Sequence, residues 1–172
     1  MSRSATTDRI KQTFLGAIGK LGLSVATMDE LAAESDNDAV RGTFRRLGQA
    51  DREVYLVRGV GLINLHVRSE PPGWWNVLKS VKGDLDWLKE NLNLGCYYVL
   101  LVGRSDHFVA DGYIASDFNS PPFLRSPGLE ATKYSINERQ HLDRSKVLLS
   151  VGKVAATLAA HRKPKEQEST SE

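Results

Sequence analysis

Apolar residues at helical spacing predict a first helix over residues 7–21. Its hydrophobic positions recur every three or four residues, which is the period of a helix with one buried face. They are Ile10, Phe14, Ile18 and Leu21. Gly22 follows as a natural C-terminal stop, and Thr6, Thr7 and Asp8 are candidate N-caps. The chain is therefore expected to open with one amphipathic helix.

Two more helices, separated by a short polar turn, are predicted next. Thr27 is followed three residues later by Glu30, a capping-box pattern that starts a helix over residues 28–33. Residues 35–37 form the turn, and a longer helix is predicted over residues 38–49. The apolar positions of this longer helix fall on one face, so its polar and charged positions lie on the solvent side.

A β-hairpin is predicted after the third helix. Residues 53–57 and 62–67 are apolar runs on either side of the turn at 58–61, which reads Arg-Gly-Val-Gly. The order of helix, turn, helix and hairpin resembles the winged helix-turn-helix family, and the resemblance covers residues 6–68. It implies duplex DNA as the partner, with residues 38–49 in the major groove and the hairpin as the wing.

Five side chains of this segment are candidates for DNA contact. Arginine reads guanine and glutamine reads adenine through paired hydrogen bonds, and Arg45 and Gln49 lie one helical turn apart on the exposed face. Arg41 and Arg46 flank them and suit phosphate contacts, and Arg58 sits at the predicted wing tip. A merely solvated or protein-binding surface remains an alternative, because the net charge is only +2.

The second half is predicted to be a small α+β domain over residues 72–160. Two prolines and a glycine at 71–73 break the chain before it. The periodicity then predicts helices over 74–91 and 145–160, strands over 96–102, 107–115 and 132–137, and a loop over 117–128. The polar tail, residues 161–172, is expected to be disordered. The fold class is thus α+β, with a winged helix-turn-helix first.

Aromatic side chains of the second half are candidates for binding a partner or a ligand. Trp74 and Trp75 are adjacent on the predicted helix, so both cannot be buried equally. The final helix carries a wide apolar stripe that could join two copies of the chain or belong to its own core. A homodimer or a protein partner is therefore expected beside DNA.

Composition excludes several classes of protein. The single cysteine, Cys96, rules out a disulfide framework and a cysteine metal cluster. No signal peptide or apolar run of membrane-spanning length is visible, which predicts a cytoplasmic protein without membrane contact. No glycine loop for phosphates and no metal-ligand spacing is present, so neither cofactor nor metal is expected.

A catalytic constellation is not visible either. A restriction-type nuclease needs acidic residues at a strand end and a Glu-x-Lys or similar pattern on the next strand. Asp106 and Asp111 are the acidic pair available in the second half, and no lysine follows them at a suitable spacing. We therefore predict that the protein is not an enzyme.

A second resemblance concerns the residues after the proline break. Trp74-Trp75, the strand at 97–103 and the segment 133–137 resemble accessory modules found beside restriction nucleases. The expected function is sequence-specific binding of double-stranded DNA, as in transcriptional regulation. The alternative is a protein-protein interaction module, or an accessory subunit of a nucleic-acid-processing complex of the restriction or defence type.

Overall fold

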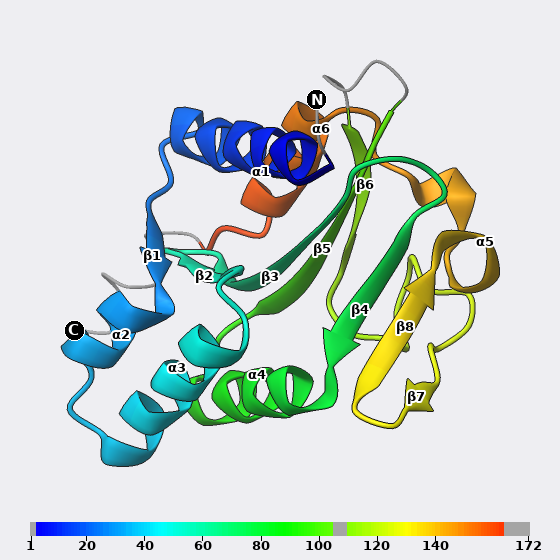
Figure 1. Cartoon of the computed structure of the whole chain (residues 1–172). Coiled ribbons are helices and arrows are strands. Elements are labelled where there is room, and N and C mark those ends of the chain that lie inside the picture. Colours follow the sequence, from blue (N-terminus) through cyan, green and yellow to red (C-terminus); the bar gives the residue numbers. More distant parts are fainter. Residues whose placement is uncertain (1–2, 105–109, 164–172) are drawn as a thin grey trace.

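A five-stranded mixed sheet runs through the middle of the protein (Figure 1). The computed structural model describes residues 3–104 and 110–163. The strands lie in the order β1 (Val25–Thr27), β2 (Val54–Val57), β3 (Gly61–Arg68), β5 (Cys96–Gly103) and β6 (Ala110–Ala115). β3 and β5 are parallel, and the other neighbours are antiparallel. The chain is an α+β protein, as predicted.

Helices cover both faces of this sheet. One face is covered by α1 (Arg3–Lys20) and α6 (Val151–Ala159), and the other by α2 (Met28–Glu34), α3 (Asp38–Ala50) and α4 (Lys79–Leu92) (Figure 1). A small second sheet of β4 (Trp74–Leu78), β8 (Lys133–Asn137) and β7 (Leu129–Glu130) lies beside α4. A short helix, α5 (Glu138–His141), and the 3-10 turn η1 (Arg144–Lys146) complete the fold.

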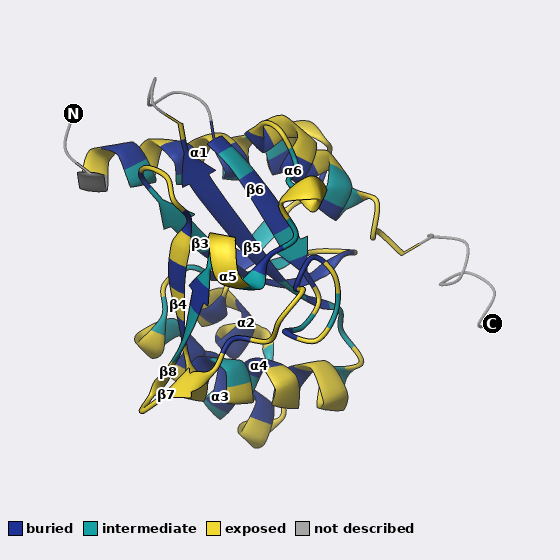
Figure 2. Ribbon diagram, turned by 90° about the vertical axis from the view of Figure 1, so that its right-hand side faces the viewer, coloured by how far each residue is buried: buried dark blue, intermediate teal, exposed yellow. Residues whose placement is uncertain are grey.

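The alternation of side chains along β5 produces two hydrophobic cores. Tyr98 and Leu100 point into the core beneath α3 and α4, whereas Val99 and Leu101 point into the core beneath α1 and α6. Figure 2 shows the central strands buried and the outer faces of the helices exposed. A strand buried on both faces reads as a continuous apolar run, and that prediction for β5 is confirmed.

Local capping signals determine where the second and third helices begin. The Thr27 hydroxyl accepts a hydrogen bond from the Glu30 amide at 3.2 Å and donates to the Glu30 carboxylate. The Asn37 side chain accepts from the Val40 amide at 3.0 Å and starts α3. These helices and the hairpin are confirmed.

The first helix begins earlier than its predicted caps. α1 starts at Arg3, so Thr6, Thr7 and Asp8 lie inside the helix and do not cap it. The start differs by four residues from the predicted position 7, a difference that apolar spacing does not detect because helix ends depend on local capping.

The two predicted segments share one sheet. The proline break lies between β3 and β4, but β3 pairs with β5 over seven residues, from Leu62 to Arg68. Leu62 and Tyr98 belong to the same hydrophobic core. The predicted units at 6–68 and 72–160 are therefore in continuous contact.

The structure corrects the predicted helix over residues 74–91. Residues 74–78 form strand β4, and the helix begins only at Lys79. Trp75 and Val77 are buried, whereas Trp74, Asn76 and Leu78 are exposed, which is the two-residue period of a strand. Val81, Leu85 and Leu88 follow a true helical period in α4, whereas Trp74 and Leu78 of the strand fit that period by chance.

The final helix is also shorter than predicted. Residues 144–146 form a 3-10 turn, and α6 begins at Val151 after the Ser150 cap. Between them, Leu148 forms two backbone hydrogen bonds with Gly112, of 2.8 and 3.0 Å. This bridge holds the segment extended along the edge of β6, which begins at Ala110 and continues through the predicted break at Gly112.

The start of the predicted disordered tail is packed against the body. The Lys163 amide donates to the Gly59 carbonyl at 2.9 Å, and the His161 ring lies edge-on to Tyr97 with centroids 4.8 Å apart. Residues 164–172 of that prediction, and 107–109 of the predicted strand, lie outside the described residues. Within the described part of the chain, no helix is long and apolar enough to cross a membrane.

A buried polar network joins the small sheet to the large one. The Trp75 indole N–H donates to the Leu101 carbonyl at 3.0 Å, and the Trp75 ring meets the Tyr113 ring edge-on. The buried Glu138 carboxylate accepts from the Tyr113 hydroxyl and from the Gly73 amide. Each of these hydrogen bonds replaces one that the buried polar group would form with water in the unfolded chain.

Substitution of Trp75 should therefore cost more stability than substitution of its neighbour. Trp75→Phe removes the bond to Leu101 and leaves a gap, which predicts a loss of about 1–3 kcal/mol in the free energy of unfolding. Trp74 is 53% exposed, so Trp74→Phe should change it by less than about 0.5 kcal/mol. Urea unfolding followed by circular dichroism measures both, and equal losses would contradict the assignment of β4.

Candidate nucleic-acid interface

The predicted reading face lies along α3, beside α4 (Figure 1). Val40, Phe44 and Leu47 are buried, so α3 is fixed by the core under the sheet. Arg45 and Gln49 are exposed on the opposite side, one turn apart. Neither has a side-chain partner among the described residues, so both are available to a ligand.

The other two arginines of α3 are held by neighbours. Arg41 is partly buried, and its guanidinium donates to the Ser35 carbonyl at 3.1 Å and pairs with Asp38. Arg46 reaches across to α4 and pairs with Asp84 at 3.1 Å. Hydrogen bonding and charge attraction by Asp84 raise the pKa of Arg46. Part of the positive charge of α3 is thus directed at protein carboxylates.

The hairpin tip lies against the body of the protein and does not project from it. A Cβ atom at Gly61 would lie 2.5 Å from the Gly95 carbonyl oxygen, so the two backbones touch where β3 begins. Arg58 is exposed and pairs with Glu34 of α2 at 3.0 Å. The Gly59 carbonyl is occupied by the Lys163 amide. Only the exposed side of Arg58 could reach a phosphate.

The two adjacent tryptophans have different environments. Trp75 is buried against Leu101 and Tyr113, which leaves no surface for a partner. Trp74 is exposed on the outer face of the small sheet, beside Asn137 of β8. The apolar stripe of α6 packs on α1 and the sheet within the same chain. Of the two adjacent tryptophans, Trp74 is therefore the one that remains exposed for a contact.

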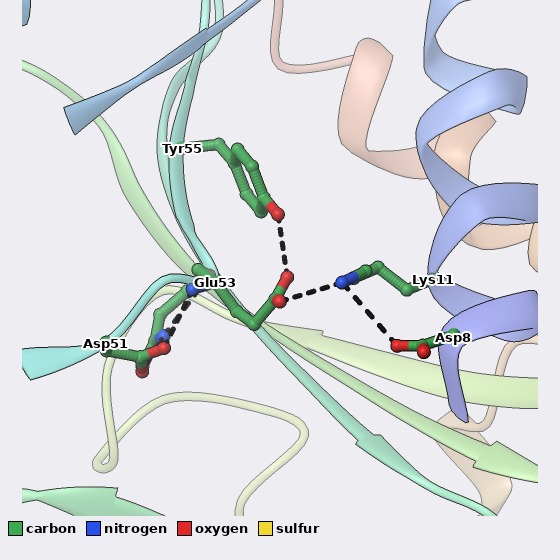
Figure 3. Close-up of polar contacts among 6 residues, drawn as sticks. Asp8, Lys11, Asp51, Glu53 and Tyr55 are labelled. Carbon is green, nitrogen blue, oxygen red and sulfur yellow. Dashed lines mark hydrogen bonds and ion pairs between the residues drawn. The ribbon is translucent and has the colours of Figure 1, made fainter. Parts of the chain in front are cut away.

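A polar cluster that we did not predict lies where α3 ends and β2 begins (Figure 3). The Glu53 carboxylate accepts from Lys11 of α1 at 2.9 Å and from the Tyr55 hydroxyl at 2.7 Å. Asp51 accepts from the Glu53 amide at 2.8 Å and from the Asn64 side chain at 2.9 Å. The cluster joins α1 to the hairpin.

A histidine completes this cluster. His66 Nε2 lies 2.7 Å from the Asn64 side-chain oxygen, so Nε2–H donates and the neutral ring keeps its other nitrogen unprotonated. Desolvation lowers the pKa of His66, against the attraction of Asp51 and Glu53. The pKa of Lys11 is raised by its bond to Glu53. The signal available in the sequence was two polar residues, Asn64 and His66, inside an apolar strand.

The cluster partly matches the arrangement sought for a restriction-type nuclease. Asp51 and Glu53 precede one strand, and Asn64-Leu65-His66 stands on its antiparallel neighbour, with Val54 paired to Asn64. Asn64 and His66 thus stand where a Glu-x-Lys pattern would have its glutamate and its lysine. Among the described residues, no three metal-binding side chains come together. The carboxylates accept from protein donors, so the cluster holds elements in place.

The acidic pair considered earlier does not form a site in the described part of the chain. Asp106 lies outside the described residues, and Asp111 pairs with Arg104 and accepts from the Ser150 amide at 3.3 Å.

No protein-family model matches the chain, and no curated protein or solved structure is detectably similar to it.

The lowered pKa of His66 predicts a dependence of stability on pH. Below the unfolded pKa of about 6.5, the unfolded chain takes up a proton that the folded chain resists. The free energy of unfolding should therefore fall as the pH drops from about 7 to about 5. His141 contributes in the same direction, since burial and the positive charge of Arg125 lower its pKa.

The variant His66→Gln isolates the contribution of His66. Glutamine keeps a donor for Asn64 but does not titrate, so the slope of the urea midpoint against pH should become shallower. Asp117 and Asp143 have lowered pKa values, but they change the stability only at more acidic pH, because carboxylates titrate near pH 4. An unchanged slope would show that His66 is not held neutral.

Proposed function

We propose that the protein binds duplex DNA through the exposed face of α3, with Arg45 and Gln49 in contact with base edges. The observation that supports this most is that both side chains are exposed, one turn apart on a helix whose other face is buried, and without a side-chain partner in the described part of the chain. Arg suits guanine and Gln suits adenine in the major groove. A role in transcriptional regulation follows if the bound site is sequence-specific.

The ion pairs around this face set the expected strength of binding. Arg46–Asp84 and Arg58–Glu34 are ion pairs whose guanidinium groups are exposed to solvent, and such pairs contribute little to stability. DNA phosphates could replace the carboxylates as partners of both arginines at little cost. The Asp84 and Glu34 carboxylates would stay nearby, however, and would repel the DNA backbone. Binding should therefore be modest and strongly reduced by salt.

Arg45→Ala tests the assignment of the reading face. Loss of a base contact should weaken binding to a selected duplex by about tenfold and relax its sequence preference. Lys133→Ala is the matched control, because it removes one positive charge from an exposed residue at the start of β8 on the small sheet. Fluorescence anisotropy with a labelled duplex at low salt measures both. Equal effects of the two variants, or no binding by the wild type, would overturn the proposal.

Asp84→Asn tests the same face by a gain of binding. The change frees Arg46 and removes one repelling carboxylate, so affinity should rise by up to about fivefold, the factor for ~1 kcal/mol. Asp86→Asn, on the same helix, is the matched control. Asp86 pairs with Lys82 and not with an α3 residue. A gain of the same size in both variants would point to overall charge alone.

The second candidate function is that of an accessory subunit in a nucleic-acid-processing complex. The observation that favours it is the placement of Asp51 and Glu53 against Asn64 and His66, which is a restriction-type arrangement with an uncharged amide and an imidazole in two places. Trp74 offers an exposed contact for a protein partner.

This candidate predicts that the chain alone does not cleave duplex DNA when Mg²⁺ or Mn²⁺ is added. The reason is that Asn64 supplies no negative charge and that the Asp51 and Glu53 carboxylates are already hydrogen-bonded. Agarose electrophoresis of a plasmid substrate measures nicking and cutting. Cleavage that disappears in Asp51→Asn would contradict the accessory role and identify a catalytic site.

A further inference from the structure

A hollow of about 290 Å³ lies between α6, η1 and the ends of β5 and β6. Tyr97 comes from β5, Ser116 follows β6, Lys146 belongs to η1, and His161 follows α6. The size is near the lower end of the range of ligand sites in proteins. One small ligand could therefore enter it.

The lining of this hollow differs in charge from that of the neighbouring hollows. It contains Lys146 and His161 and no carboxylate. Each of the four other described hollows includes at least one Asp or Glu, such as Asp51, Asp36, Glu90 and Glu53. The Lys146 ammonium forms no salt bridge among the described residues, and the nearest interacting carboxylate is that of Asp143, whose pKa it helps to lower. The chemistry of the lining therefore selects an anion.

The same hollow has an apolar wall. Ile114 from β6, Leu148 and two adjacent prolines line it beside the Tyr97 ring. The Tyr97 ring is itself held edge-on by His161. Burial raises the pKa of the Tyr97 hydroxyl, which therefore stays a hydrogen-bond donor at neutral pH. Such a wall accepts a flat, partly apolar body, which aromatic side chains stack against.

The surrounding segment is strongly basic. Residues 144–163 contain five cations, Arg144, Lys146, Lys153, Arg162 and Lys163, and no Asp or Glu. The rest of the chain has 18 basic and 21 acidic residues, so its net charge is −3. Arg162 donates to the Leu21 carbonyl at 3.0 Å and Lys163 to the Asn93 carbonyl at 3.3 Å, whereas Arg144, Lys146 and Lys153 are exposed. Exposed cations beside a stacking surface favour a ligand that carries phosphate.

We infer that this hollow, between α6 and the ends of β5 and β6, binds a nucleoside monophosphate unit. The base lies against Tyr97, Ile114 and Leu148, and the phosphate lies at Lys146. The unit could be a free nucleotide or one residue of a single strand. The site is separate from α3, so it stands whether or not α3 binds duplex DNA.

Calorimetric titration of the full chain with adenosine monophosphate, and with adenosine as the ligand without phosphate, tests the site. Adenosine monophosphate should bind more tightly, and Lys146→Gln should weaken it by about tenfold, as loss of one charge-assisted hydrogen bond predicts. Lys133→Gln is the matched control. Lys146 is exposed, so the variant is expected to fold, and its circular dichroism spectrum checks this.

Competition by an unlabelled oligothymidylate distinguishes the two sources of the nucleotide. Displacement of adenosine monophosphate by the strand supports a single strand, and failure of displacement supports a free nucleotide. Equal affinities of adenosine and its monophosphate, an unchanged affinity in Lys146→Gln, or no binding at all would overturn the inference. Arg45→Ala should leave this binding unchanged, which separates the result from the proposal for α3.

Discussion

The parallel pairing of β3 with β5 is the constraint on which the rest of the structure depends. It joins the hairpin after α3 to the strand after α4, so both helices are placed on one face of a continuous sheet. A parallel connection needs a long crossover, and β4 and α4 supply it. The close contact of Gly61 with the Gly95 carbonyl allows this pairing to begin at the hairpin turn.

This pairing also decides what the α3 face can do. Because α4 is held beside α3, Asp84 comes within reach of Arg46, and one cation of the expected reading face acquires an internal partner. The hairpin turn is held by the same pairing and by Lys163. In a free hairpin the turn would extend beyond the helix. Of the predicted reading residues, Arg45 and Gln49 of the helix are those without a side-chain partner among the residues that the structure describes.

The sequence predicted those elements whose signals are local. The Thr27 and Asn37 caps act within three residues, and the apolar run of β5 indicates burial on both faces without knowledge of its neighbours. The failures involve distant partners. Residues 74–78 become a strand because β8 pairs with them, and Leu148 stays extended because it pairs with Gly112. Periodicity within one segment carries no information about such partners.

The same reasoning applies to the sites. The exposed positions of Arg45 and Gln49 follow from helical periodicity, but the pairing of Arg46 with Asp84 joins residues 38 positions apart. The Asp51–Asn64–His66 cluster needs the strand register before its members can be seen together. The hollow beside α6 draws on four segments, although its charge could be read from residues 144–163 as a stretch without acids. The net charge of the whole chain does not reveal this basic segment, because the positive charge of residues 144–163 and the negative charge of the remaining residues nearly cancel. For the proposed phosphate site, the distribution of charge therefore says more than its sum.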